Sequence, residues 1–450
     1  MKVFTELQEK FRQPHWHLDP ELAIFDTVLE FHPELLDVVK DEVLAVGKHN
    51  GLGRQDSPTV EQVVRAAIYK EVKGLSYAEL EYQQYDSRMC EVFLQLSKRF
   101  CDSVWQKYIS AISSNSLDAL LKALNCLAID AGLEDLQKLR MDTTVVETDI
   151  HYPTNNALLW DGIRSSTRIL QQFAEERVAE LVRDYTKQAK TYYFRINVTK
   201  DKTDRRELFE RQFRLFDRCL RQTRRVLECL QPRYESLDSG DRQRVEHLQD
   251  LLPKMETIRN VAYRRELMGE QVPPDEKLFS LYEEHTEMIV KGKGNVLFGR
   301  KASFASGRSG LILQAAVLED MTDGESFEPT LEDVIVSYQK VPRDVATDGA
   351  YASRHNQDVA QDLGVKNIVF NKVVGSLQNI TSSLQMETRL KKWRSGMEAV
   401  ISNLKRGFDL RRCVWKGEAH FKAKVFWSVI AYNLRVMGRL FLRKLMQQLA

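Results

Sequence analysis

The sequence predicts a mixed α/β protein in which a mixed-sheet core carries a helical amino-terminal domain and a long all-α insertion. Helical periodicity dominates residues 1–135, and short β-branched runs appear only near 139–150 and again after 295. Between these runs, residues 165–289 show the spacing of long, highly charged helices. We therefore expect a helical domain at 1–135, a core formed by 136–164 and 291–450, and a helical insertion at 165–290.

The composition is that of a folded protein without a disulfide scaffold or a structural zinc site. Of the 450 residues, 43% are hydrophobic and 29% are charged, which excludes extensive disorder. The six cysteines form no CxxC pair and no cluster with histidine. We expect no secretory signal and no membrane span, because Lys and Arg interrupt the most apolar stretch, 421–442. These features predict a cytoplasmic protein.

Three helix starts stand out in the amino-terminal part. Asp19 precedes a proline and an apolar run, and residues 59–69 have helical periodicity. Ser76 and Glu79 have the spacing of a capping box, which predicts a helix from Tyr77. This region either binds DNA, mediates dimerisation or serves only for packing.

The middle of the chain changes from strand to helix. Residues 139–150 read as a strand, and the following tract reads as two long helices separated by a turn at 236–240. Helices paired in antiparallel fashion would make an arm or clamp. Ordinary helical packing gives the same pattern, so both interpretations stay open.

Strands return in the last third of the chain. The runs 295–304 and 310–318 are joined by a Gly- and Ser-rich turn and predict a hairpin. A helix at 331–340, a strand at 344–347, a helix at 353–363 and a strand at 367–371 follow, and helices fill the remainder. No glycine-rich phosphate loop is present, so the order predicts a mixed sheet and not a doubly wound one.

Two aspartates lie where a strand presents catalytic groups. Asp142 interrupts a β-branched strand, an environment that disfavours aspartate. Asp348 closes a second strand, and Gly349 is expected to let the backbone turn sharply after it.

A third acid, Glu398, follows on a predicted helix. At 100° per residue, Arg394 and Lys405 share its helix face, and an apolar stripe beside them would seat the helix on the sheet. Three carboxylates can hold two Mg²⁺ ions about 4 Å apart, a common arrangement for phosphoryl transfer. Arg394 and Lys405 would then bind DNA phosphates beside the ions.

The carboxy-terminal segment is strongly basic. Residues 389–450 contain fifteen Lys and Arg against three acidic residues, whereas the whole chain carries a net charge of only +2. A folded basic segment beside carboxylates predicts a surface for a polyanion. We expect Lys391, Lys392, Arg411 and Arg412 to bind DNA as well.

Several residues compete for these roles. Glu147 and Asp149 could replace Asp142, but strand alternation points them to the other face. Glu418 could replace Glu398, although its own helix lacks the Arg and Lys pair.

Three neighbours of the acids have open roles. Tyr351 and Asn356 either contact DNA or cap the next helix. His151 either contacts Asp142 without binding the metal ions or, more simply, makes a structural hydrogen bond.

The motifs together resemble those of the DDE transposases of bacterial insertion sequences, most closely the ISNCY type. The resemblance rests on residues 142–154, on Thr347-Asp348-Gly349-Ala350-Tyr351, on Arg394-x3-Glu398-x6-Lys405, on residues 431–435 and on residues 76–82. Two features depart from the family pattern. Lys391 stands where a tyrosine is usual, and the large insertion lies between the first two acids.

The resemblance implies an RNase H-like core in which Asp142, Asp348 and Glu398 bind two Mg²⁺ or Mn²⁺ ions. The family reaction cleaves a phosphodiester at each end of the element and joins the free 3′-OH to target DNA. The implied partners are the terminal inverted repeats, the target DNA and further copies of the chain, in the bacterial cytoplasm at the nucleoid. The alternatives are an RNase H-like nuclease without joining activity and an inactive, domesticated DNA-binding protein.

Overall fold

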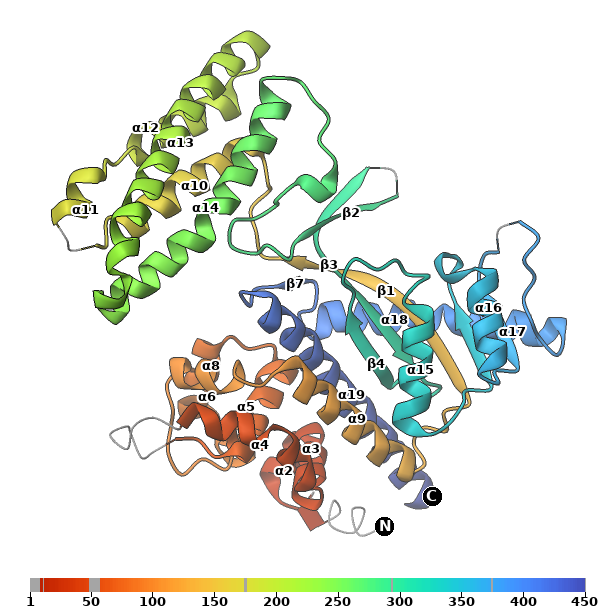
Figure 1. Cartoon of the computed structure of the whole chain (residues 1–450). Coiled ribbons are helices and arrows are strands. Elements are labelled where there is room, and N and C mark those ends of the chain that lie inside the picture. The colour runs from red at the N-terminus through yellow and green to blue at the C-terminus, as the bar shows by residue number, and fades with distance from the viewer. Residues whose placement is uncertain are drawn as a thin grey trace. The chain divides into compact units, whose positions relative to one another are not determined.

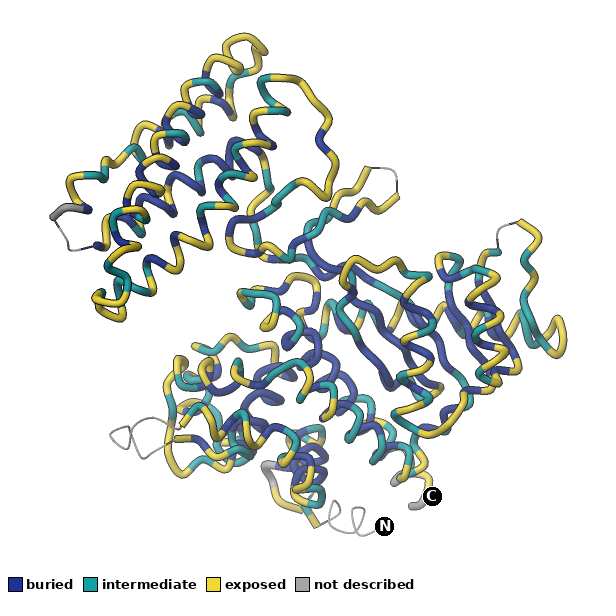
Figure 2. The backbone as a smooth tube through the Cα atoms, viewed as in Figure 1, coloured by how far each residue is buried: buried dark blue, intermediate teal, exposed yellow. Residues whose placement is uncertain are grey.

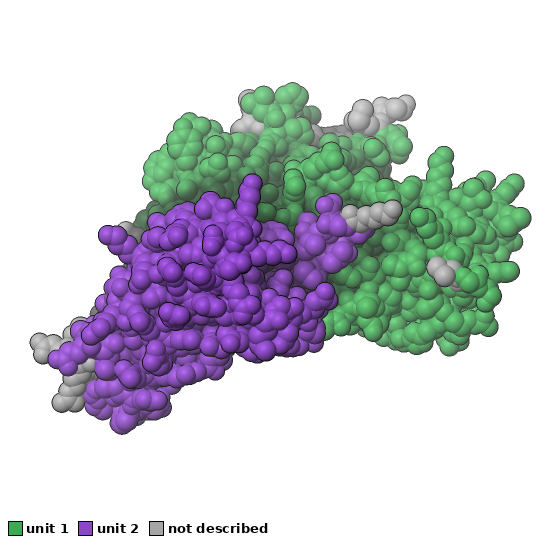
Figure 3. Space-filling model, turned by 90° about the horizontal axis from the view of Figure 1, so that it is seen from above, with its two compact units in different colours: residues 1–147, 300–450 green, residues 148–299 purple. Residues whose placement is uncertain are grey.

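The computed structural model describes residues 9–10, 12–47, 57–173, 176–292, 294–373 and 375–449. The chain divides into two compact units, one formed by residues 1–147 and 300–450 and the other by residues 148–299 (Figure 3). Strands β1 and β3 pass from one unit to the other.

The amino-terminal part is helical, as the sequence predicts. Its helices are α2 (Pro14–Leu18), α3 (Pro20–Phe31), α4 (Glu34–Gly47), α5 (Val60–Lys73), α6 (Tyr77–Asp86), α7 (Arg88–Phe93), α8 (Asp102–Ile109) and α9 (Ser114–Asp130). Asp19 caps α3 by accepting a hydrogen bond from the Leu22 amide. Capping boxes start α5 at Thr59 and α6 at Ser76. All three predicted helix starts are therefore confirmed.

The strands form a seven-stranded mixed sheet (Figure 1). The strands are β1 (Lys138–Thr148), β2 (Glu287–Lys291), β3 (Asn295–Ser306), β4 (Ile312–Val317), β5 (Asp344–Thr347), β6 (Asn367–Phe370) and β7 (Arg412–Cys413). Their order is β2-β3-β1-β5-β6, with β4 paired to β3 and β7 to β1. The pairs β1/β5 and β5/β6 are parallel, and β2/β3 and β3/β4 are antiparallel. The predicted hairpin and the mixed sheet are confirmed.

Helices cover both faces of the parallel strands. On one face, α15 (Phe327–Tyr338) and α16 (Arg354–Asp362) share an apolar cluster with alternate residues of β1, β5 and β6. On the opposite face, α17 (Leu384–Arg394) packs through Leu390 against Ala346 and Val369. The next helix, α18 (Gly396–Gly407), contributes Met397 and Leu404 to the main core. Alternate residues of β1 therefore face different helices, as the two-residue period of a strand requires.

The amino-terminal helices share one core with the carboxy-terminal helix α19 (Glu418–Leu449). Helix α19 packs against α3, α5, α9 and β4. Residues 1–135 consequently belong to the same compact unit as the sheet, although the sequence predicts a domain of their own. By composition, α19 could span a membrane over Glu418–Lys444, but 72% of its most apolar stretch is buried in the protein. That burial is typical of a core helix.

The second unit is a helical bundle with its own apolar core. Its helices are α10 (Asn155–Leu170), α11 (Glu176–Leu181), α12 (Thr186–Val198), α13 (Lys202–Leu230) and α14 (Ser239–Glu266). Buried residues recur along one side of α13 and α14, whereas the other side is exposed (Figure 2). Gly162 on α10 allows Phe216 of α13 to approach, since a Cβ there would lie 2.6 Å from the Phe216 ring.

The bundle does not have the predicted bounds. Helix α10 begins at Asn155 and packs against α13 and α14, so the helical unit starts well before residue 165. Helix α14 ends at Glu266, and residues 287–291 form strand β2 instead of the predicted helix. The predicted pair of long helices around a turn near 236–240 is confirmed.

Candidate active site

The sheet register sets the two aspartates side by side. Strands β1 and β5 run parallel, with Arg140 opposite Ala346. Two residues further along each strand lie Asp142 and Asp348, so the same register places one beside the other. Asp348 stands at the carboxyl end of β5, the end where parallel sheets usually present their functional groups.

Glu398 comes from the helix that follows the sheet. The predicted single helix is broken, because α17 ends at Arg394 and α18 begins at Gly396. Ser395 between them keeps helical dihedral angles, φ −58° and ψ −22°. Arg394 and Glu398 therefore still face each other one turn apart, as the sequence predicts.

One guanidinium joins all three acids. Nη2 of Arg394 lies 2.7 Å from Oδ2 of Asp142 and 3.8 Å from Oδ2 of Asp348, and its Nη1 lies 3.4 Å from Oε1 of Glu398. The Arg394 side chain is 8% exposed and that of Asp142 13%, whereas Glu398 is 71% exposed. The three acids, far apart in the sequence, thus gather around a single buried cation.

The surroundings of Arg394 are fixed by a second arginine. Arg140, two residues before Asp142 on β1, donates a hydrogen bond from Nη1 to the Trp393 carbonyl at 2.8 Å and lies over the Trp393 ring at 4.9 Å. Gly396 allows this approach, because a Cβ at that position would lie 2.3 Å from Nη1 of Arg140. The junction between α17 and α18 is thereby tied to the strand that bears Asp142.

Burial dominates the electrostatics of Asp142. It raises the pKa of Asp142 from 3.8 to about 6; Arg394 offsets part of the rise and the charge of Asp348 adds to it. Asp142 therefore gains its charge at the expense of folding stability.

We expect this cost to show as a pH dependence. The folded pKa lies above the unfolded one, so the stabilisation from protonated Asp142 is complete below pH 3.8 and is lost as the pH rises through 6. As the pH rises from 3.8 through 6, the unfolding free energy of the wild-type protein should fall by about 2 to 3 kcal/mol relative to that of Asp142→Asn. At higher pH the difference between the two proteins should stay constant. Urea unfolding in EDTA at several pH values measures the difference, and a flat difference would contradict the assignment.

Gly349 positions Asp348 by close packing. Its φ is not in the left-handed region, so the sharp turn expected from the sequence is not the reason for the glycine. A Cβ at Gly349 would lie 2.8 Å from the carbonyl oxygen of Lys372 and 3.0 Å from its Cβ. The backbone after β5 thus runs directly against the backbone after β6.

Gly349→Ala is accordingly expected to displace Asp348. Since the clash involves backbone atoms, we expect a loss of about 1 to 3 kcal/mol in unfolding free energy and weaker binding of Mn²⁺. Chemical denaturation and Mn²⁺ titration followed by electron paramagnetic resonance measure the two effects. Gly240→Ala in α14 is the control, because only side-chain atoms lie near its added methyl group. Unaltered Mn²⁺ binding by Gly349→Ala would show that Asp348 does not depend on this contact.

The carboxylates fit a divalent metal by their chemistry. All three provide oxygen, the ligand that Mg²⁺ and Mn²⁺ prefer, and a cation already lies among them. Within the described ranges, no three His, Cys, Asp or Glu side chains are grouped closely enough to hold a metal ion. The reason is that Arg394 lies between the acids and Glu398 extends into solvent. The buried Nε of Arg394 makes no hydrogen bond to the described residues, so the guanidinium lacks one hydrogen-bond partner.

The other predicted DNA-binding residues lie on α17, on α18 and at the start of β7. Lys391 pairs with Glu387 at 2.7 Å, and Lys392 is exposed on α17. Lys405 lies half-buried in the last turn of α18. Arg411 and Arg412 are both exposed.

The competing acids have partners elsewhere. Glu147 forms ion pairs with Arg412 at 3.1 Å and Arg411 at 3.9 Å. Glu418 lies 3.2 Å from both Arg300 and Lys422. Asp149 follows the end of β1 and is exposed. The structure brings none of them to Arg394.

The remaining neighbours are structural. His151 lies 2.5 Å from Asp161, which raises its pKa, so the structural hydrogen bond is confirmed. Asn356 donates to the carbonyls of Gly324 and Tyr351, and Ser353 caps α16 in its place. Tyr351 is buried in the core.

Two residues of the site were not predicted. Arg140 shares a strand face with Asp142, so strand alternation could have found it. Asp323, in the loop before α15, pairs with Lys301 at 2.9 Å and adds to the rise in the Asp142 pKa. Nothing in the sequence distinguishes Asp323 from the other acids of its loop.

Comparison with known proteins relates one part of the chain to a family. Residues 281–434 match the family model of the transposase DDE domain. The matched segment includes Asp348, Arg394 and Glu398, and Asp142 on β1 precedes it. No curated protein and no solved structure matches the chain. Residues 281–434 are therefore similar to the DDE domain of transposases, the family that the motifs of the sequence resemble.

Proposed function

We propose that this protein cleaves DNA at the ends of an insertion sequence and joins the freed 3′-OH to target DNA. The single observation that supports the proposal most is the gathering of Asp142, Asp348 and Glu398 around one buried cation. Two aspartates on adjacent parallel strands and a glutamate on a following helix also suit an RNase H-like catalytic core.

In the proposed mechanism, Asp142, Asp348 and Glu398 would hold two Mg²⁺ or Mn²⁺ ions. Bound there, the ions would activate the attacking oxygen and stabilise the leaving oxygen of the phosphodiester. Arg394 holds the acids together in the metal-free protein by neutralising part of their charge. Its planar guanidinium also has the geometry to bind a DNA phosphate in bidentate fashion, and would do so if other counter-ions neutralised the acids.

The proposed substrate is double-stranded DNA with terminal inverted repeats, and the protein acts as a dimer or larger assembly in the bacterial cytoplasm. The exposed basic residues of segment 389–450, among them Lys392, Arg411 and Arg412, would supply an electrostatic surface for this polyanion. The helical unit is proposed as an arm on DNA, since arginines recur along the exposed side of α13.

A strand-transfer assay tests the proposal. Labelled duplexes with the terminal repeats that flank the gene are incubated with Mg²⁺ and a supercoiled target plasmid, and products are separated on denaturing gels. We expect both cleaved ends and ends joined to the plasmid. Cleavage without joined product would indicate a nuclease, and neither product at any metal concentration would indicate an inactive DNA-binding protein.

A further inference from the structure

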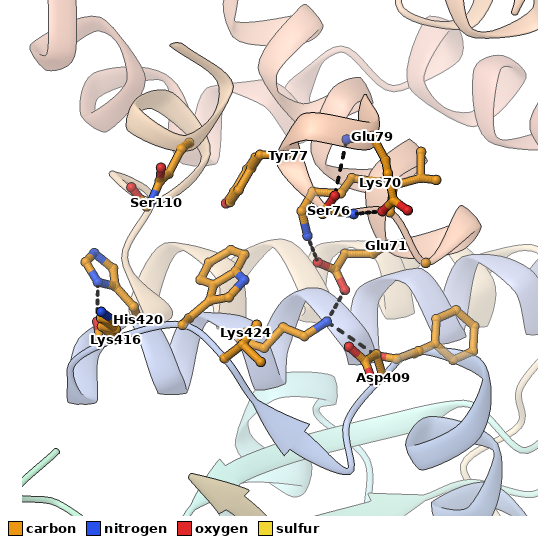
Figure 4. A pocket seen from close by; sticks show the side chains of 16 residues that line it. Lys70, Glu71, Ser76, Tyr77, Glu79, Ser110, Asp409, Lys416, His420 and Lys424 are labelled. Carbon is orange, nitrogen blue, oxygen red and sulfur yellow. Dashed lines mark hydrogen bonds and ion pairs between the residues drawn. The ribbon is translucent and has the colours of Figure 1, made fainter. Parts of the chain in front are cut away.

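A second candidate site lies in a pocket of about 670 Å³ within the unit formed by residues 1–147 and 300–450. The end of α5, the start of α6, α8 and the segments on either side of β7 line it, together with the first turns of α19 (Figure 4). Asp142, Asp348, Glu398 and Arg394 are not among its lining residues. The pocket is therefore separate from the candidate active site.

The inner wall of the pocket carries a surplus positive charge. Nζ of Lys70 lies 3.0 Å from Oε1 of Glu71, and Nζ of Lys424 lies 2.5 Å from Oε2 of the same carboxylate. All three side chains are buried. Burial pushes the pKa of Glu71 upward, but Lys424 and Lys70 together hold it below its ordinary value, so Glu71 is charged. One carboxylate thus faces two buried ammonium groups, and a second anion would complete the neutralisation.

Aromatic rings lie beside these charges. The rings of Tyr77 and Trp415 are 6.1 Å apart, and both residues line the pocket. The ammonium of Lys70 lies 4.9 Å from the Tyr77 ring centre and 5.5 Å from that of Trp415. The buried hydroxyl of Tyr77 makes no hydrogen bond to any residue that the structure describes. An unpaired donor at this position calls for an acceptor.

The remaining charged groups lie at the rim. Glu79 accepts a hydrogen bond from the Ser76 amide as the cap of α6. Glu79, Asp409 and Lys416 sum to one negative charge, but all three are exposed, so solvent screens their charges far more than those of the buried groups. The surplus inside the pocket is therefore cationic, and its other feature is aromatic surface.

We propose that this pocket binds a nucleotide. The phosphate would lie against Lys70, Lys424 and the Tyr77 hydroxyl, and the base would pack against Trp415 and Tyr77. A simple anion would leave the aromatic surface uncovered, and an apolar ligand would leave the surplus charge unpaired. A free mononucleotide and an unpaired nucleotide of a DNA strand share this chemistry. The inference does not depend on cleavage by the acid cluster.

Isothermal titration calorimetry in EDTA tests the proposal, since no metal is then available for catalysis. The probes are dAMP, deoxyadenosine and 2-deoxyribose 5-phosphate. We expect dAMP to bind more tightly than either fragment. If deoxyadenosine binds as tightly as dAMP, the phosphate contact is overturned. If 2-deoxyribose 5-phosphate binds as tightly as dAMP, the base contact is overturned. If neither dAMP nor a single-stranded oligonucleotide binds, the whole proposal is overturned.

Trp415→Ala is expected to weaken dAMP binding roughly tenfold or more, as for other stacked bases. Trp415→Phe should restore most of the affinity. Tyr82→Ala is the matched control, because Tyr82 is an exposed aromatic residue of α6 outside the pocket. Unchanged dAMP affinity in a folded Trp415→Ala protein, verified by circular dichroism, would refute the site.

Lys70→Met tests the charge separately, and Tyr77→Phe, which removes only the unpaired hydroxyl, serves if that buried replacement unfolds the protein. Either change should weaken dAMP more than deoxyadenosine, and an equal effect on both would contradict a phosphate contact. Oligonucleotides distinguish the two sources of the nucleotide. If a duplex with a single-stranded end binds more tightly than a blunt duplex, and this difference depends on Trp415, the pocket is assigned to DNA. If dAMP and the duplex with the overhang bind with equal affinity, the pocket is assigned to the free nucleotide.

Discussion

Asp142→Asn, Asp348→Asn and Glu398→Gln are each expected to abolish cleavage and joining while leaving DNA affinity nearly unchanged. Each change removes one anionic oxygen ligand but preserves the shape of the side chain. Because divalent ions contribute several kcal/mol to such transition states, the rate should fall on the order of 10³-fold or more. The strand-transfer assay measures the rate, and fluorescence anisotropy with labelled terminal repeats measures the affinity.

The competing acids supply matched controls for this result. Glu147→Gln, Asp149→Asn and Glu418→Gln make the same chemical change at positions that do not contact Arg394. All three variants should retain activity. Full activity of any variant of Asp142, Asp348 or Glu398 would remove that residue from the metal site, and inactivity of a control would bring that acid into it.

Arg394→Ala should have the second largest effect. It should lower the stability of the protein but strengthen its binding of Mn²⁺. Without Arg394, Asp142 stays buried beside Asp348 with no counter-ion. The metal-free protein should lose about 3 kcal/mol of unfolding free energy, as when a buried ion pair loses one partner. Mn²⁺ should bind the variant more tightly than the wild type, because no guanidinium then competes for the carboxylates. Cleavage should still be reduced through the lost phosphate contact.

Thermal unfolding with and without Mn²⁺ and Mn²⁺ titration by electron paramagnetic resonance test both parts. Lys392→Ala is the control, because it removes the same charge from an exposed position of α17. Arg394→Lys should lie between wild type and Arg394→Ala, since a single ammonium cannot bridge three carboxylates as a guanidinium does. Unchanged or weaker Mn²⁺ binding by Arg394→Ala would show that Arg394 does not stand in the place of the ions.

Local sequence patterns determined much of the fold. The caps at Asp19, Thr59 and Ser76 begin helices, because side-chain oxygens satisfy the first free amides of a helix over only three or four residues. The β-branched runs that contain or precede Asp142 and Asp348 form strands. These signals depend on neighbours in the chain, so the sequence alone is enough to find them.

The tertiary structure decided what depends on distant residues. The boundary of the helical unit follows from the packing of α10 on α13 and α14, and no local signal marks it. Gly349 is required by the backbone at Lys372, and Trp415 meets Tyr77 across more than three hundred residues of chain.

The candidate site likewise depends partly on local sequence patterns and partly on the packing of distant residues. The sequence alone selected the three acids and Arg394, because acids in strands and a cation one helical turn from a glutamate are local patterns. It assigned Arg394 to DNA phosphate, whereas the folded chain places that guanidinium among all three carboxylates. Burial and charge proximity set this arrangement and the pKa of Asp142, and both exist only after β1, β5 and α17 have packed together.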